Sequence, residues 1–288
     1  MSDAQRRKAE LARTFSLVAE EYEAHNGSFF NPVGARLVAL AGPDAGHRVL
    51  DLGCGRGAVL FAAAAAVGPR GTAVGIDLAP GMVRCTAADA AARGLPQVAV
   101  RLGDAERPDF PDGSFDAVLS SFAVIHTPDP ATALAAAHRL LTPGGVFGYT
   151  TFGAEEDPRW AEPSAALTAF AAGPRPATGS GAVDGRGRSA GPNSLARDAE
   201  GAAGLLRAAG FTTVRTVERD SVTHYANPQA WWDALWASGR RATLEAVPPE
   251  RRPEARRAAF AALAPLTGPD GSLTRRTTIR YTTAVRPA

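Results

Sequence analysis

A glycine-rich turn that directly follows an apolar run is the feature that most constrains the fold of this chain. Residues 48–57 read RVLDLGCGRG, with Gly53, Gly55 and Gly57 at every second position. Because glycine lacks a Cβ, it adopts positive φ easily and lets a ligand approach the backbone closely. Where a strand leads into a helix, the free N–H groups of the first helical turn also favour negative charge. The stretch therefore predicts a strand, a tight turn and a helix around a nucleotide-like ligand.

Apolar runs and helical segments alternate from this turn to residue 153. The run FDAVLSSFA at 115–123 is almost wholly apolar, as expected of a central parallel strand that is buried on both faces. The helix predicted at 129–141 begins with Asp129 as its N-cap and Pro130 at its first position, and it ends at the turn 142–145. Repeated β-α-β units with short connections predict an α/β fold with a doubly wound, mostly parallel sheet. The predicted strands are 48–53, 72–78, 98–104, 115–123 and 146–153, and the predicted helices between them are 57–67, 80–93 and 129–141.

The N-terminal segment is predicted to consist of two helices. Residues 9–24 place apolar side chains at spacings of three and four, which is typical of an amphipathic helix that packs onto the rest of the chain. Asn26, Gly27 and Pro32 predict a break, and a second helix follows at 33–41.

Beyond residue 153 the pattern is less regular. Residues 173–193 are rich in Gly, Pro, Ser and Arg and lack apolar periodicity, which predicts a flexible surface segment. Order returns with helical and then strand-like patterns. Helices are predicted at 195–211, at 228–238 and at about 250–264, and strands at 212–222 and 275–287.

Composition and charge narrow the classes to which the chain can belong. No apolar run approaches the roughly 20 residues needed to cross a bilayer, and the N-terminus lacks the apolar segment of a secretory signal, so a cytoplasmic protein without membrane contact is expected. Cys54 and Cys85 predict neither a disulfide framework nor a metal site. Residues 201–288 hold 13 arginines and 7 acidic residues, which fits either a solvated helix face or attraction to an anionic substrate. No aromatic residues are interleaved in its arginine pairs, and the net charge of the whole chain is only +2, so no nucleic-acid partner is expected.

Three carboxylates at the ends of successive strands indicate which ligand the turn binds. Asp51 precedes the first glycine, where it would repel a pyrophosphate but suits an ammonium group. Asp77 ends the second strand, where an acid can accept hydrogen bonds from both ribose hydroxyls. Asp104 ends the third strand and can accept from the exocyclic amine of adenine. An amine, a free ribose and an adenine without an essential phosphate describe S-adenosylmethionine, although Gly53, Gly55 and Ala58 also match the dinucleotide pattern GxGxxA.

The motifs VLDLGCGRG, GIDLAPGM, GDAERPDFPDGSFDAVLSSFAVIH and LLTPGG occur in that order between residues 49 and 145. This set resembles class I S-adenosylmethionine-dependent methyltransferases, most closely the small-molecule branch that includes the quinone-biosynthesis enzymes. The resemblance covers residues 48–150 densely, and FSLVAEEYEA at 15–24 resembles that branch's N-terminal helix.

The resemblance implies a fold, a domain organisation and a set of cofactor contacts. It implies a Rossmann-like seven-stranded sheet whose last strands form an antiparallel hairpin. The domains expected are an N-terminal helical lid at 1–46 and a methyltransferase domain at 47–288, with a flexible insert at about 155–195 and a helical cap at about 226–268 over the acceptor pocket. The cofactor contacts expected are Tyr22, Asp51, Gly53, Gly55, Asp77, Leu78, Met82, Asp104, Ala105 and Ser121.

Methyl transfer from a sulfonium requires few catalytic groups, because the donor is already activated and the protein mainly aligns the acceptor and excludes water. A general base is needed only if the acceptor retains its proton. His126 and Glu155 are the candidate catalytic residues, since each follows a strand that ends at the acceptor side of the sheet. Trp232 and Trp236 share a helix face and could line the acceptor pocket or pack in a core.

The function expected is methyl transfer to an oxygen, carbon or nitrogen of a small, largely apolar metabolite of secondary metabolism, aromatic in part. Two alternatives stay open, namely a cyclase or decarboxylase that binds the cofactor without transferring its methyl group, and a dinucleotide-dependent oxidoreductase. Ser120–Ser121–Phe122–Ala123 stands where nucleic-acid N-methyltransferases carry Asp/Asn-Pro-Pro-Tyr/Phe, which argues against that class. A monomer or a homodimer is expected.

Overall fold

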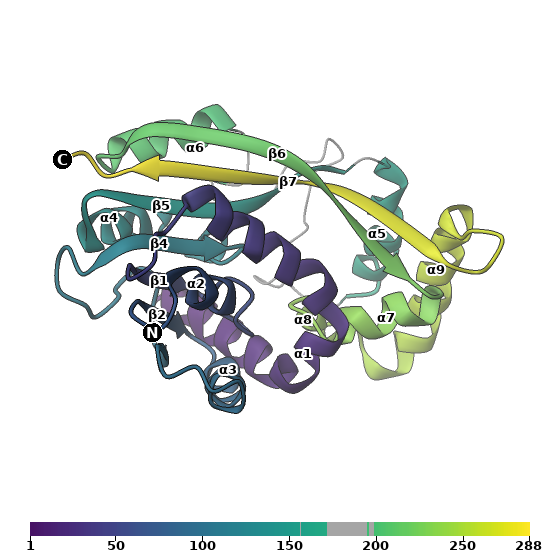
Figure 1. Cartoon of the computed structure of the whole chain (residues 1–288). Helices are drawn as coiled ribbons and strands as arrows, with labels where there is room; N and C mark the ends of the chain where they lie inside the picture. Colours follow the sequence, from purple (N-terminus) through teal and green to yellow (C-terminus); the bar gives the residue numbers. More distant parts are fainter. Residues whose placement is uncertain (156, 172–194, 196–198) are drawn as a thin grey trace.

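One sheet organises the computed structural model of this chain, which describes residues 1–155, 157–171, 195 and 199–288. These described residues form a seven-stranded sheet in the order β3-β2-β1-β4-β5-β7-β6 (Figure 1). The first five strands are parallel, β7 is antiparallel to β5, and β6 is antiparallel to β7. The strands are β1 Arg48–Leu52, β2 Thr72–Asp77, β3 Val98–Leu102, β4 Phe115–Ser121, β5 Leu141–Glu155, β6 Thr212–Tyr225 and β7 Leu273–Val285. The predicted mostly parallel sheet with a final antiparallel hairpin is confirmed.

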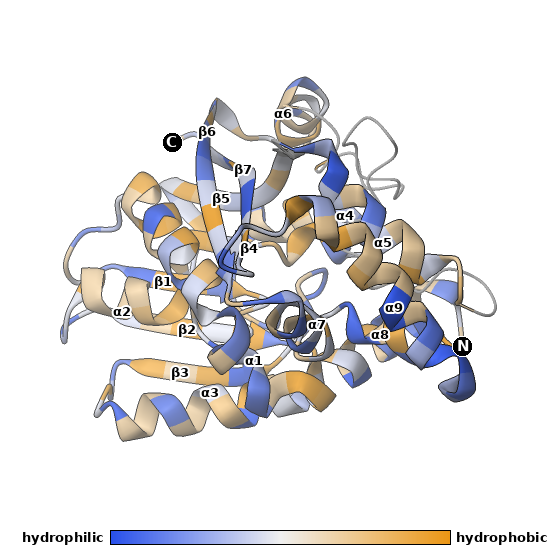
Figure 2. Ribbon diagram, turned by 90° about the vertical axis from the view of Figure 1, so that its right-hand side faces the viewer, coloured by the Kyte–Doolittle hydropathy of each residue, from blue (hydrophilic) through white to orange (hydrophobic). Residues whose placement is uncertain are grey.

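Helices cover both faces of the sheet, as a doubly wound fold requires. Val49 and Leu119 pack on one face with residues of α1 and α2, whereas Leu50 and Val118 pack on the other face with residues of α4 and α6. Figure 2 shows β2 and β3 largely hydrophobic, while α3 alternates between hydrophobic and hydrophilic residues. The helices are α1 Asp3–Ala41, α2 Leu60–Val67, α3 Pro80–Ala92, α4 Pro130–Leu140, α5 Ala161–Thr168, α6 Ala199–Ala208, α7 Pro228–Trp236, α8 Arg241–Glu245 and α9 Arg252–Leu263, with short 3₁₀ turns η1 Val124–His126, η2 Pro158–Trp160, η4 Pro249–Arg251 and η5 Ala264–Leu266.

A third core lies beyond one end of the sheet, where α5, α7, α8 and α9 pack together (Figure 1). Trp160 and Leu167, which fall inside the insert predicted at about 155–195, are buried in this core beside residues of α7 and α9. The flexible segment predicted at 173–193 lies outside the described residues.

The break predicted in the N-terminal segment at Asn26, Gly27 and Pro32 is wrong, because α1 runs from Asp3 to Ala41 with Pro32 inside it. Asn26 does not cap a helix end; its side chain donates to the carbonyls of Tyr22 and Ala237 instead. Pro32 removes only one helical hydrogen bond, and the buried face that follows it at Val33 and Leu37 packs on the sheet. Figure 1 shows the two halves of α1 running in different directions, so one helix reaches two parts of the molecule.

The turn predicted at 142–145 lies within β5. The β4–β5 pairing places Leu141 opposite Phe115 and then Val146 opposite Ala117, so the turn residues form an irregularity in the strand. Gly144 takes a φ of 80°, which glycine tolerates, and its amide donates to the carbonyl of Arg286 at 2.9 Å. Pairing with the chain end therefore keeps this turn within the sheet.

Candidate cofactor site

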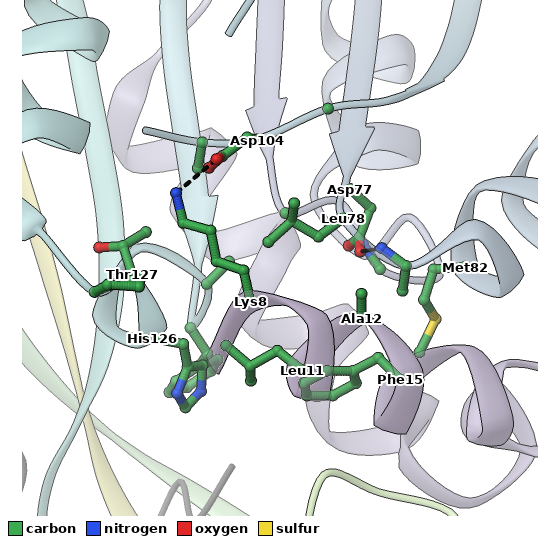
Figure 3. A pocket seen from close by; sticks show the side chains of 18 of the residues that line it. Lys8, Leu11, Ala12, Phe15, Asp77, Leu78, Met82, Asp104, His126 and Thr127 are labelled. Carbon is green, nitrogen blue, oxygen red and sulfur yellow. Dashed lines mark hydrogen bonds and ion pairs between the residues drawn. The ribbon is translucent and has the colours of Figure 1, made fainter. Parts of the chain in front are cut away.

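A pocket lies at the carboxyl ends of the parallel strands, where the first half of α1 crosses them (Figure 3). This is the edge at which doubly wound sheets bind their ligands. Eight of the ten predicted cofactor residues line it, namely Tyr22, Gly53, Gly55, Asp77, Leu78, Met82, Asp104 and Ala105. Their roles toward a cofactor stay predictions.

The glycine turn shapes the floor of this pocket. Gly53 has a φ of 74°, and a Cβ built on it would lie 2.2 Å from the Cβ of Ala123, so a side chain cannot fit there. Gly55 has a φ of 49° and nothing within 4 Å of where its Cβ would stand, so this face of the backbone is open. The turn itself is fixed because the amides of Gly53 and Cys54 both donate to the Ile76 carbonyl, at 2.8 and 2.9 Å.

Asp77 ties the glycine turn to the start of α3. One of its carboxylate oxygens accepts from the Gly55 amide at 2.9 Å and the other from the Ala79 amide at 2.8 Å. Burial raises the pKa of Asp77, and these two amides offset part of the rise. Each oxygen has a second lone pair for a ligand hydroxyl. Since the Gly55 amide already serves a carboxylate, it is not free for a pyrophosphate, which disfavours the dinucleotide alternative.

Asp51 is buried beneath the glycine turn and does not line the pocket. Neither of its carboxylate oxygens has a hydrogen-bond partner among the described residues. Burial raises the pKa of Asp51 to about 8, the charge of Asp77 adds to the rise, and the nearby Leu60 amide opposes it. A buried, unpaired acid next to Asp77 makes this side of the site favourable for a cation.

Asp104 already has a cationic partner, which the sequence did not reveal. Its Oδ2 lies 2.6 Å from the Nζ of Lys8 in α1, and its Oδ1 accepts from the Glu106 amide at 2.9 Å (Figure 3). Lys8 also contacts the carboxylate of Glu106. Burial lowers the pKa of Lys8, but the hydrogen bonds and charges of the two carboxylates outweigh it, so the pKa is raised. Lys8 is therefore a permanent cation at the pocket.

One face of α1 roofs the pocket. Lys8, Leu11, Ala12 and Phe15 stand at positions i, i+3, i+4 and i+7, and Tyr22 lies two turns farther on the same face. The amphipathic spacing predicted that this face is covered, but only the fold shows that it covers a ligand site. The Tyr22 ring stacks on Phe30 with centroids 5.5 Å apart.

His126 lines the pocket from η1, directly after β4. Burial and the positive charge of Arg7 lower the pKa of His126 to about 4, so the imidazole is neutral at physiological pH. Glu155, the other catalytic candidate, is the last residue of β5 and pairs with Thr277 of β7. Ser121 lies outside the lining, and its hydroxyl shares a hydrogen bond of 2.9 Å with that of Thr150.

Phe122 brings an aromatic cluster to the pocket. It has a φ of 55°, a conformation that costs a bulky residue about 1–3 kcal/mol and that clusters at functional sites. Its ring lies 4.4 Å from Phe152 and 5.6 Å from Phe30, centroid to centroid, and Phe29 completes the group. By contrast, Trp232 packs against Phe260 in the third core, and Trp236 lies beneath Arg241 and Arg252. The tryptophans thus do not line the pocket.

The residues present fit S-adenosylmethionine. Asp77 provides hydrogen-bond acceptors, and a cationic ligand would favour the ionised form of Asp51. The glycine turn lets a ligand approach the backbone, and Met82 and Leu78 provide apolar surface. Among the described residues, no group of three His, Cys, Asp or Glu side chains could hold a metal ion.

Three comparisons with known proteins identify the family and the fold. A family model described as a methyltransferase domain matches residues 49–145. Nocamycin O-methyltransferase from Saccharothrix syringae is 42% identical over 247 residues, which span 83% of this chain and 85% of that protein. Aklanonic acid methyltransferase DauC from a Streptomyces strain is 43% identical over 144 residues, which span 50% of this chain and 66% of that protein. In structure, the YcgJ protein from Bacillus subtilis is 19% identical and shares the fold with a TM-score of 0.57 over 88% of this chain and 98% of its own.

Proposed function

The chain belongs to the class I S-adenosylmethionine-dependent methyltransferases, and from that premise we propose that it methylates a carboxylate oxygen of a small, largely apolar metabolite. Methyl transfer from S-adenosylmethionine to a small molecule is the family activity, and the carboxylate is the finer step. In the described residues no helix is long and apolar enough to cross a membrane. Nucleic acid is not the proposed acceptor, because the segment after β4 lacks the residues of that class.

The low pKa of His126 is the main support for a carboxylate acceptor, because an imidazole with this pKa is a weak base. A phenolic hydroxyl has a pKa of about 10, so moving its proton to an imidazole with a pKa of about 4 costs roughly 8 kcal/mol at 1.36 kcal/mol per unit. A carboxyl group has a pKa near 4 and has already lost its proton at pH 7. It therefore needs no base, and neutral His126 is free to donate or accept a hydrogen bond that orients the acceptor.

Arg7 supports an anionic acceptor. Its charge acts on His126, and within the described residues its side chain makes no hydrogen bond or ion pair. A cation that is close enough to His126 to affect its pKa, and has no hydrogen-bond or ion-pair partner among the described residues, suits the charged end of a carboxylate. The names of the two relatives point in the same direction, since one is an O-methyltransferase and the other acts on an acid.

The proposed reaction requires the site to align the cofactor and the acceptor. S-adenosylmethionine, when bound, supplies a methyl group activated by its sulfonium. Asp77 would hold the ribose, Asp51 would offset the ligand's positive charge, and residues 1–46 would act as the lid. Phe122 and the rings packed on it would give the apolar body of the acceptor a surface and exclude water.

The experiment that tests this function follows a labelled methyl group. The enzyme is incubated with methyl-tritiated S-adenosylmethionine and a panel of hydrophobic carboxylic acids, phenols and amines, and the products are treated with mild alkali. Label that appears on acids and returns as volatile methanol after alkali supports a methyl ester. Transfer only to phenols or amines, with alkali-stable label, would overturn the carboxylate proposal.

A further inference from the structure

The N-terminal part of α1 is attached to the rest of the protein at a single polar point. Lys8 Nζ lies 2.6 Å from Asp104 Oδ2 and also contacts Glu106 Oε2. Within the described residues, no other hydrogen bond or ion pair joins residues 3–12 to another element; the contacts of Arg6, for example, stay with Met1 and Asp3. The position of these first turns therefore depends on Lys8 and on apolar packing.

The same turns supply part of the pocket roof. Leu11 and Ala12 follow Lys8 by three and four residues and line the pocket beside it (Figure 3). A shift at Lys8 would move these apolar side chains with it, because they belong to one rigid helical face. The roof over the cofactor is thus set by the ion pairs at its edge.

The Glu106 carboxylate is itself held in place by burial and by a second hydrogen bond. Only 8% of its side chain is exposed. Its second carboxylate oxygen accepts from the Asp129 amide at 2.7 Å. Asp129 caps α4 and follows His126, Thr127 and Pro128, all of which line the pocket. One carboxylate therefore joins the roof in α1 to the loop that carries His126.

We propose that Lys8 is a positioning residue whose ion pairs with Asp104 and Glu106 latch the first turns of α1 over bound cofactor and slow its release. The latch is an added role at the cofactor site and rests on family membership, not on the identity of the acceptor. The latch also requires that Lys8 and the cofactor bind Asp104 at the same time. A carboxylate has enough lone pairs for both.

The test measures S-adenosylhomocysteine binding by titration calorimetry and its dissociation rate by stopped flow. Lys8→Met removes the charge but keeps the aliphatic stem, Lys8→Arg keeps the charge, and Glu106→Gln weakens the latch from the other side while it can still accept from the Asp129 amide. Arg13→Met is the matched control, because Arg13 lies on the same helix and forms an exposed ion pair of 3.4 Å with Glu245 in α8.

Lys8→Met is expected to raise Kd about tenfold, mainly through faster dissociation, since loss of one partner of a partly buried ion pair is costly. Lys8→Arg should stay within about threefold of the wild type and Arg13→Met within about twofold, and the Lys8→Met/Glu106→Gln double variant should lose little more than Lys8→Met alone. Unchanged or tighter binding by Lys8→Met, with folding verified by circular dichroism, would overturn the latch. Failure of the wild type to bind S-adenosylhomocysteine would instead count against the cofactor assignment.

Discussion

Gly81 lies against the backbone of Ser16 so closely that a Cβ at position 81 would stand 2.6 Å from the Ser16 carbonyl oxygen. The Gly81 amide also donates to the Ser16 hydroxyl at 3.2 Å. This contact sets α1 directly on the start of α3, beside Met82 and Asp77 at the pocket. The roof and the floor of the site are thus held together by a position that tolerates no side chain.

Gly81→Ala should therefore destabilise the protein by about 1–3 kcal/mol, because the added methyl group forces the two helices apart. Gly204→Ala is the control, since Gly204 lies in α6 with nothing within 4 Å of its Cβ position. That change should be neutral or stabilising by up to about 1 kcal/mol. Urea unfolding followed by circular dichroism measures both. Equal stability of the two variants would mean that the contact between α1 and α3 leaves room for a methyl group at position 81.

Asp77→Asn should weaken S-adenosylhomocysteine binding at least tenfold. The amide group keeps one acceptor oxygen but turns an NH₂ toward the backbone N–H of Gly55 or Ala79, so both the glycine turn and the expected ribose contact suffer. Asp116→Asn is a suitable control, because Asp116 pairs with Arg48 at 2.9 Å near the amino ends of β4 and β1. The pocket lies at the carboxyl ends of the strands. Calorimetry should show an unchanged Kd for the control. An unchanged Kd for Asp77→Asn as well would show that Asp77 only stabilises the turn and does not bind the cofactor.

The local chemistry of the site could be predicted from the sequence, because it depends on short segments. Asp77 and the glycine turn belong to strand ends whose positions follow from β-α alternation, and the structure places them at one pocket. The α1 boundaries could not be predicted in the same way. Asn26 and Pro32 carry the local signals of a break, but one of the two carbonyls that Asn26 contacts belongs to Ala237, 211 residues away.

The roles of Lys8 and of the tryptophans depend on tertiary contacts for the same reason. Lys8 and Asp104 are 96 positions apart in the sequence, and no short-range pattern indicates that they pair. Trp232 has the spacing of a pocket wall, but its ring packs into the third core, between α7 and α9. Spacing indicates which side chains share a face, whereas packing decides what that face touches.

Asp51 should make the cofactor-free protein less stable as pH rises. Its pKa is about 8 in the folded chain and about 3.9 when unfolded, so the folded state binds the proton more tightly. The resulting stabilisation is complete below about pH 4 and is lost as pH rises to about 8. Asp51→Asn removes this dependence. Urea unfolding between pH 5 and 9 should show the wild type losing stability relative to Asp51→Asn, and parallel pH curves for the two proteins would contradict the assignment.

His126 should leave the pH profile of kcat/KM flat between about pH 6 and 9 for a carboxylate acceptor. With a pKa of about 4 it stays neutral over this range, and the acceptor stays ionised. His126→Asn keeps hydrogen-bonding capacity and should retain more activity than His126→Ala, while both bind S-adenosylhomocysteine normally. A rise in rate near pH 6.5 that His126→Asn abolishes would show instead that the imidazole acts as a base.

Arg7 should determine recognition of the acceptor's charge and leave the cofactor unaffected. Arg7→Gln removes the cation that acts on His126, so KM for an acidic acceptor should rise about tenfold while Kd for S-adenosylhomocysteine changes less than twofold. Arg6→Gln is the matched control, because Arg6 is exposed and bonds to Met1 and Asp3 within its own segment. Initial rates against acceptor concentration separate KM from kcat. The effect should also shrink as salt rises, since a partly exposed cation is screened. If Arg7→Gln and Arg6→Gln have the same KM, the acceptor's anionic group binds elsewhere in the pocket.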